Sequence, residues 1–397
     1  MKKILFTALF IAALGAGLFA QELKWSGYFN TGLGFVFTDV DNADPYITAF
    51  GVDSGQFGYR FRLNGAYTNA DANAGVRFRI QSQAQGNQSF SLPYLYGWFK
   101  PLEMLTLNAG LVDDGTWASG GALLNEDVGE GLGFLAKLSL GGLDAGAGAY
   151  LGGTGSGSSN NPLAGMGNNT IKPEDMKYVL SLGYTAKDLF KIVASVRTSS
   201  RTNGGIDTAF TGASAPNDEA ILGFKLLALP KLTAVLEAKA DYLYEFSDSG
   251  TVFIYETLGY DLGALDLGLN AGQYLNQADN TDLGLMISPW VSYTMGKLVP
   301  RLDALYFMAG KPSYVADATG SGSSGKYNFL NWEAYAPNWD SDYSVIAVRP
   351  SVKFNLDSNT AIELGDIVNV ELGPDNAYGT ESRRLTNVFY VDFTWKF

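Results

Sequence analysis

The sequence predicts an all-β fold: a transmembrane, antiparallel, up-and-down β-barrel of about eighteen strands. Three observations predict it. Apolar and polar side chains alternate along most of the chain after residue 21, which is the side-chain period of a strand. No stretch beyond that point has the apolar spacing of a helix. The connections between the predicted strands also alternate between short and long, as they do when all turns lie on one side of a membrane.

The composition narrows the possible functions. The chain has 397 residues, with 40 acidic and 27 basic side chains and a net charge of −13. It contains no Cys and no His, which excludes disulfides, thiolate or imidazole metal sites and a Ser-His-Asp triad. The acidic balance argues against a nucleic-acid partner. No cofactor, metal site or enzymatic activity is predicted.

The first twenty residues have the layout of a cleaved secretory signal peptide. Lys2 and Lys3 form a basic start, residues 4–19 are apolar, and Ala20 precedes the polar pair at 21–22. The apolar run is shorter than the roughly 20 residues that a spanning helix needs. We expect residues 21–397 to form a single barrel.

Eighteen strands follow from the alternation, most of them near the roughly 9–11 residues of a tilted membrane strand. They are predicted at 24–37, 55–68, 73–83, 91–100, 104–112, 131–140, 142–151, 177–185, 189–199, 219–227, 231–244, 251–261, 264–274, 283–295, 298–309, 343–355, 360–371 and 384–397. Pro93, Pro289, Pro300 and Pro350 fall inside them and predict bulges or shifted boundaries, because proline cannot donate to the ladder. Loss of two strands would leave sixteen, which is the alternative.

The alternation is clearest in residues 55–83 and fixes which side faces lipid. Moving this segment by one position would bring four arginines into the membrane. Each would cost about 2–4 kcal/mol near the midplane. The register is therefore strongly specified.

The long connections should all lie on the external side, and the even number of strands brings both chain ends to the periplasmic side. These external connections are predicted at 38–54, 113–130, 152–176, 200–218, 310–342 and 372–383. A closed wall is required because every backbone polar group in lipid must be paired within the protein.

The C-terminal strand carries the most specific motif. Alternating aromatic side chains lead to a terminal phenylalanine, at Phe389, Phe393, Trp395 and Phe397. With this ending, the chain resembles the porins and related outer-membrane channels of diderm bacteria. The resemblance implies an outer-membrane location, passage of small solutes and a possible homotrimer. It also implies that Phe393, Trp395 and Phe397 are an assembly signal read by the outer-membrane assembly machinery.

Four arginines form the best candidate for a functional cluster. Arg60 and Arg62 lie on the polar side of one predicted strand, and Arg77 and Arg79 on the polar side of the next. A turn near residues 69–70 would place Arg62 opposite Arg77 and Arg60 opposite Arg79, with Cβ atoms about 5 Å apart. The sequence thus predicts a basic patch on the lumen wall near mid-depth.

The third external connection could face this patch. It contains five acidic residues, Asp113, Asp114, Glu126, Asp127 and Glu130. In general porins the third external loop folds into the lumen opposite an arginine ladder, so the resemblance implies a constriction here. The alternative is that the arginines are solvated wall residues and that this connection lies outside.

These observations favour an outer-membrane channel for passive diffusion of ions and small polar solutes. Aromatic residues in the connection 310–342 leave open a transport barrel selective for a sugar or a hydrophobic compound. An adhesin or surface antigen is the third alternative. The sequence does not fix the ion preference.

Overall fold

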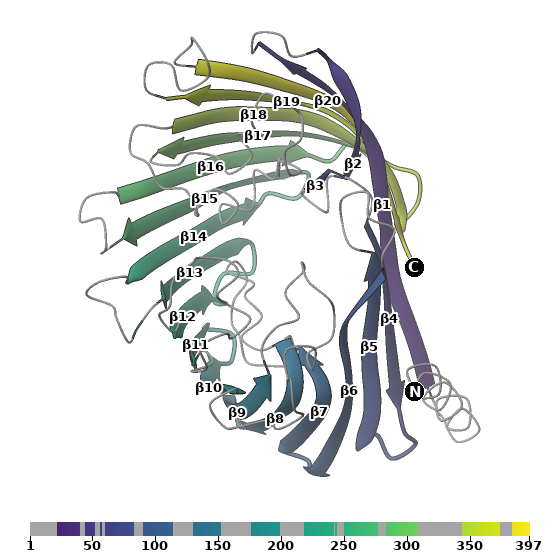
Figure 1. Cartoon of the computed structure of the whole chain (residues 1–397), viewed down its shortest axis with the longest axis vertical. Coiled ribbons are helices and arrows are strands. Elements are labelled where there is room, and N and C mark those ends of the chain that lie inside the picture. Colours follow the sequence, from purple (N-terminus) through teal and green to yellow (C-terminus); the bar gives the residue numbers. More distant parts are fainter. Residues whose placement is uncertain are drawn as a thin grey trace, which may run out of the picture.

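A computed structural model shows a closed antiparallel barrel of eighteen strands, with two short additional strands in the first external connection (Figure 1). The structure describes residues 22–39, 44–51, 56–57, 60–82, 90–113, 130–151, 176–198, 218–241, 243, 250–276, 283–308, 344–373 and 383–397. The predicted signal peptide at 1–20 lies outside them. In the described part, no helix is long and apolar enough to span a membrane.

Every predicted strand is confirmed, with ends shifted by up to three residues, apart from the second, predicted at 55–68, whose described residues form two elements at 56–57 and 60–68. The strands are β1 (Glu22–Thr38), β2 (Tyr46–Gly51), β3 (Gln56–Phe57), β4 (Arg60–Thr68), β5 (Ala74–Ser82), β6 (Phe90–Leu102), β7 (Leu105–Asp113), β8 (Glu130–Leu140), β9 (Leu143–Leu151), β10 (Met176–Ala186), β11 (Phe190–Arg197), β12 (Glu219–Leu226), β13 (Leu232–Asp241), β14 (Thr251–Asp261), β15 (Leu265–Asn276), β16 (Leu283–Tyr293), β17 (Leu298–Met308), β18 (Ser344–Asn355), β19 (Thr360–Leu372) and β20 (Arg383–Lys396).

The barrel closes between its first and last strands. β1 pairs with β20 from Tyr28 to Thr38, and with β4 along its first half. The terminal Phe397 exchanges two backbone hydrogen bonds with Gly27, at 2.8 and 3.1 Å. Its ring also stacks on Phe61 of β4, with the ring centres 6.4 Å apart. The last residue of the chain therefore helps to seal the wall.

The first external connection is more ordered than expected. The sequence predicted a loop at 38–54, but β2 pairs with the second half of β1, from Val36 and Tyr46 to Gly32 and Phe50. β3 in turn pairs with β2. The wall next to β1 is thus completed by β4 in one half and by β2 in the other.

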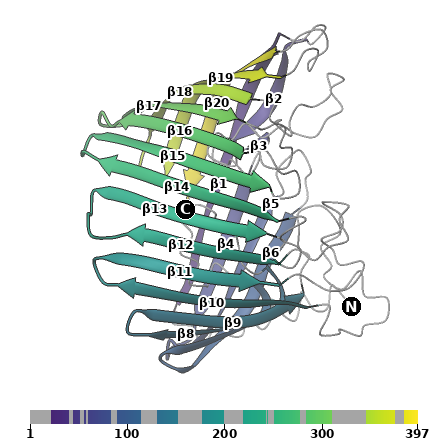
Figure 2. The ribbon, with the colours of Figure 1, turned by 90° about the vertical axis from the view of Figure 1, so that its left-hand side faces the viewer.

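Short turns connect the strands at one end of the barrel, and Figure 2 shows them together at the left. In the turn before β19, Asp357 accepts hydrogen bonds from the backbone N–H groups of Asn359 and Thr360, at 2.7 and 2.9 Å. The backbone hydrogen bond from Asn359 is the main reason that the pKa of Asp357 lies below its usual value. The turn contains three of the residue types that favour tight turns.

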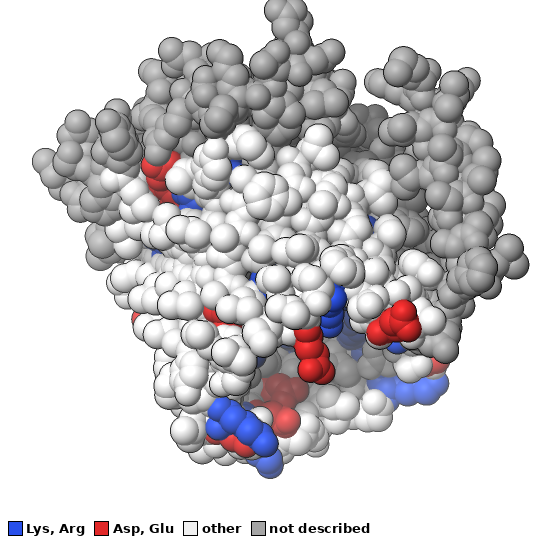
Figure 3. Space-filling view, turned by 90° about the horizontal axis from the view of Figure 1, so that it is seen from below, with Lys and Arg blue, Asp and Glu red and all other residues white. Residues whose placement is uncertain are grey.

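The two faces of the wall differ as the alternation predicts. In β10, Leu180 and Leu182 on the outer face are 65% and 54% exposed, whereas the residue before each of them, Val179 and Ser181, is buried on the lumen side. Figure 3 shows a wall of the barrel from outside: charged side chains gather mainly along its lower edge. The outer surface is therefore an apolar belt suited to lipid.

Two acidic residues depart from this pattern. Glu256 lies midway along β14 on its outer face, between Leu236 and Ala271 on the neighbouring strands. Asp366 lies midway along β19 on the same face and accepts a hydrogen bond from Asn387, with N and O 3.2 Å apart. A carboxylate at mid-depth is costly on a lipid-facing surface.

The prolines interrupt the ladder, as predicted. Pro289 pairs with β15, but the register between β16 and β17 skips its position. Pro350 pairs with β17 and is skipped between β18 and β19. Pro93 falls where the register between β5 and β6 is irregular. Pro289 and Pro350 each break the pairing on one side only, whereas Pro93 has no ladder partner on β5 or β7. The strand itself continues in each case.

Candidate lumen site

The four predicted arginines lie on the lumen side of β4 and β5, but in a different register from that predicted. Arg62 is opposite Gln81, Asn64 is opposite Arg79, and Ala66 is opposite Arg77. The prediction that Arg62 faces Arg77 and that Arg60 faces Arg79 is therefore wrong. The four side chains form a staggered row, which lowers the repulsion between them.

The turn between these strands explains the change of register. It spans residues 69–73 instead of two residues, because the Asn69 side chain accepts hydrogen bonds from the backbone N–H groups of Asn73 and Ala74, both at 3.0 Å. Ala72 adopts a left-handed conformation with φ = 53°. The sequence signal for this longer turn was Asn69, because an asparagine side chain can accept backbone hydrogen bonds and so close a turn.

Carboxamide and aromatic groups contact two of these arginines, Arg62 and Arg79. Arg79 Nε donates to Asn64 Oδ1 at 2.8 Å, and its guanidinium carbon lies 4.9 Å from the centre of the Tyr94 ring. Arg62 Nε donates to Gln81 Oε1 at 3.1 Å and lies over the Tyr28 ring at 5.6 Å. Each arginine therefore has a carboxamide and an aromatic ring among its partners.

Aromatic residues of β6 belong to this wall. The strand predicted at 91–100 has apolar or aromatic residues on both sides. The register explains the aromatic residues on its inner side, because Tyr94 and Tyr96 pair with Arg79 and Arg77 and therefore face the lumen with them. Tyr96 belongs to a cluster of buried, lumen-facing side chains that none of the sequence arguments singled out. Its other members are Val112, Leu135, Tyr150 and Val179, and all five are at most 4% exposed.

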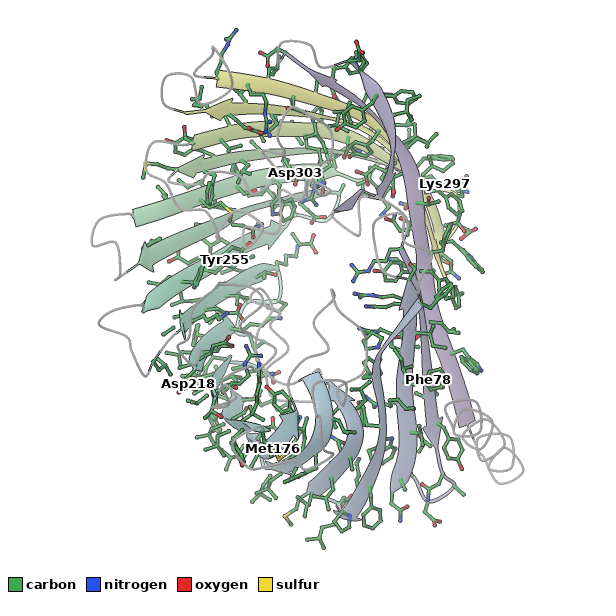
Figure 4. All side chains as sticks on the ribbon, viewed as in Figure 1. Phe78, Met176, Asp218, Tyr255, Lys297 and Asp303 are labelled. Carbon is green, nitrogen blue, oxygen red and sulfur yellow. The ribbon has the colours of Figure 1, made fainter. Side chains whose placement is uncertain are left out.

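Other arginines of the lumen wall are paired with carboxylates. Arg301 and Arg349 both contact Asp303, at 2.7 and 2.9 Å, and Asp303 is only 1% exposed. Figure 4 labels Asp303 on the inner side of the wall. Arg197 pairs with Glu219 in the same manner on another part of the wall.

Basic side chains outnumber acidic ones on the lumen side of the described strands. The register places these basic residues there: Lys24, Arg60, Arg62, Arg77, Arg79, Lys137, Lys177, Lys191, Arg197, Lys225, Lys239, Arg301, Arg349, Lys353, Arg384 and Lys396. The acidic ones with described side chains are Asp144, Glu219, Glu237, Asp261, Asp266, Asp303, Glu363, Glu371 and Asp392. The described inward-facing side chains of β4 to β7 include no acidic residue. On the described strands the lumen face thus carries net positive charge, although the chain as a whole is negative.

The acidic third connection is described only at its two ends. Asp113 and Glu130 are paired residues at the external ends of β7 and β8. Asp114, Glu126 and Asp127 lie outside the described residues. The structure therefore does not test the predicted constriction, and in the described part it contains no group of acidic residues arranged to hold a metal ion.

A closed barrel with an apolar outer belt and a polar, charged inner wall is the architecture of an outer-membrane β-barrel. Solved structures of such barrels have the same fold. The outer-membrane protein OpdK of Pseudomonas aeruginosa has a TM-score of 0.53 and 9% sequence identity, over 96% of this chain and 100% of that one. OpdL of the same organism has a TM-score of 0.52 and 10% identity, over 94% and 99% of the two chains.

A third similar structure is OccAB4 of Acinetobacter baumannii, with a TM-score of 0.50 and 11% identity over 95% of this chain and 99% of that one. No family model and no curated protein matches the sequence. At these identities the likeness concerns the fold, so the choice of solute has to be argued from the residues of this chain.

Proposed function

We propose that the protein is an outer-membrane channel for passive diffusion of ions and small polar solutes, and that it favours anions. The observation that carries the proposal is the charge of the lumen wall. Solutes pass within a few ångströms of that wall, so local charge governs their distribution more than the net charge of −13 does.

The arginine patch is the proposed selectivity determinant. Arg79 lies near the middle of β5, Arg62 is the third residue of β4, and no acidic side chain is present among the described inward-facing residues of β4 to β7. A mid-depth position matters because an anion there has the least access to bulk water. Fixed positive charge then replaces part of the lost hydration.

The acidic third connection is proposed to complete the constriction. It leaves the wall at Asp113, next to Val112, which is fully buried although it faces the lumen. Buried apolar side chains on this side of the wall support the presence of protein inside the lumen at this level. Asp114, Glu126 and Asp127 would then set the negative side of a transverse field.

Planar-bilayer recordings test the proposal. Under a KCl gradient, the native protein should give stepwise conductance with a reversal potential on the anion-selective side. The double variant Arg62→Glu with Arg77→Glu should move it toward cations. Absence of conductance would refute the channel, and an unchanged reversal potential in the variant would remove the patch as its determinant.

A second candidate is a transport barrel selective for a ring-bearing solute. The half-buried Tyr94 and Trp98 on the lumen wall favour it, because aromatic faces can stack on sugar rings. Saturable block of the current by a sugar, absent in Tyr94→Ala, would distinguish it from a non-selective channel.

The proposed assembly signal consists of Phe393, Trp395 and Phe397. In β20 the first two project to the outer face, and Trp395 is 45% exposed. Recognition by the assembly machinery predicts that Phe397→Ala lowers the yield of folded protein in the outer membrane. A homotrimer remains part of the proposal and is tested by the mass of the detergent-solubilised protein.

A further inference from the structure

The arginines of the lumen wall are held in two different ways. Arg197, Arg301, Arg349 and Arg384 each contact a carboxylate, which compensates their charge locally. Their role in the wall is therefore mainly structural.

Arg79 is held without such compensation. Its Nε donates to Asn64 Oδ1 at 2.8 Å, and the same oxygen lies 3.3 Å from the Tyr94 hydroxyl, which also donates to it. The guanidinium lies over the Tyr94 ring. In the described part of the chain, no carboxylate lies within ion-pairing distance of Arg79.

The geometry points to Asn64 as a selectivity-determining residue of the pore. Its carboxamide fixes the orientation of Arg79 and leaves the positive charge intact. Because the contact uses Nε, the two terminal amino groups of Arg79 remain available to an anion. A guanidinium presented in this way suits an oxyanion with two coplanar oxygens, above all a carboxylate.

The neighbouring cross-strand pair contains a similar carboxamide contact. Gln81 Oε1 accepts from Arg62 Nε, and Arg62 lies over Tyr28. Two amide-held arginines thus lie on adjacent strands, one pair apart in the register. The inference rests on the proposed channel function, which it deepens by assigning a solute class and a positioning residue.

The decisive variant is Asn64→Asp, which replaces the side-chain carboxamide by a carboxylate of the same shape beside Arg79. A unit charge about 4 Å away is worth about 1 kcal/mol in water, so we expect the anion-to-cation permeability ratio to fall about fivefold. The matched control is Asn270→Asp, which adds the same charge to the lumen side of β15, where Asn270 pairs with Thr257. We expect it to change the ratio less than twofold.

Two further variants separate positioning from charge. Asn64→Ala keeps the lumen charge but releases Arg79, so the permeability of acetate relative to chloride should fall while both remain above that of potassium. Asn64→Gln should restore part of the acetate preference. Heat-modifiable migration on gels confirms that each variant is folded.

The outcomes distinguish the two levels of the proposal. A native protein that does not conduct, or that prefers cations, would refute the proposed function. A native protein that prefers anions, with Asn64→Asp no different from Asn270→Asp, would overturn the role of Asn64 alone.

Discussion

Placing one arginine on the outer face should destabilise the barrel by an amount set by its depth. Leu182 of β10 is 54% exposed on that face, and its cross-strand neighbours are Ala194 and Ala145, so an arginine fits without overlap. An eleven-residue strand tilted by about 45° spans about 23 Å, and Leu182 lies about 9 Å from its periplasmic end. That position is within about 3 Å of the midplane.

At this depth the penalty for Leu182→Arg is about 2–4 kcal/mol. It corresponds to a roughly 30-fold to several-hundred-fold shift in the unfolding equilibrium. Urea titration of the protein in lipid vesicles measures it. The depth-matched control is Thr257→Arg, on the lumen side of β14. Its free energy of unfolding should fall by less than half as much as that of Leu182→Arg. Equal losses in the two variants would refute the assignment of the faces.

Three further predictions concern the wall. Asp303→Asn removes the carboxylate that pairs with the buried Arg349 and should lower the free energy of unfolding in urea by about 3–5 kcal/mol. A decrease under about 1 kcal/mol would contradict the pairing. Gly27→Val should weaken closure and lower the yield of heat-modifiable barrel, because a Cβ there would overlap the Arg62 carbonyl oxygen and the Phe397 ring; a native yield would argue against that contact. Glu256→Leu should stabilise the protein in lipid vesicles by up to about 2 kcal/mol, and destabilisation would show that this carboxylate has a partner.

The sequence alone predicted the strand number and the faces of the wall, because lipid and water impose their alternation on every strand. Arg60, Arg62, Arg77 and Arg79 were predicted on one side of the wall for the same reason, and the register gives them the same parity as Tyr28 and Asn64. The alternation of apolar and polar residues is a property of each strand by itself, so it can be recognised without knowing which strands pair with one another.

Register and side-chain partners could not be predicted in the same way. The five-residue turn at 69–73 depends on a hydrogen bond that the Asn69 side chain accepts from the Asn73 backbone, and this turn moved every pair of the β4–β5 hairpin. The roles of Asn64 and Gln81 follow from that register, so they were invisible until it was known. β2 was missed because its pairing with β1 replaces that of β4 halfway along the strand.

The absence of cysteine from the native chain makes single-cysteine labelling along β5 the most direct test of the wall. Cysteines introduced in turn at residues 76–81 would be treated with a charged, membrane-impermeant maleimide in intact vesicles. We predict labelling at 77, 79 and 81, and protection at 76, 78 and 80 unless a lipid-soluble reagent is used. Uniform labelling, or labelling at every third or fourth position, would contradict a strand with one side in lipid and the other in water.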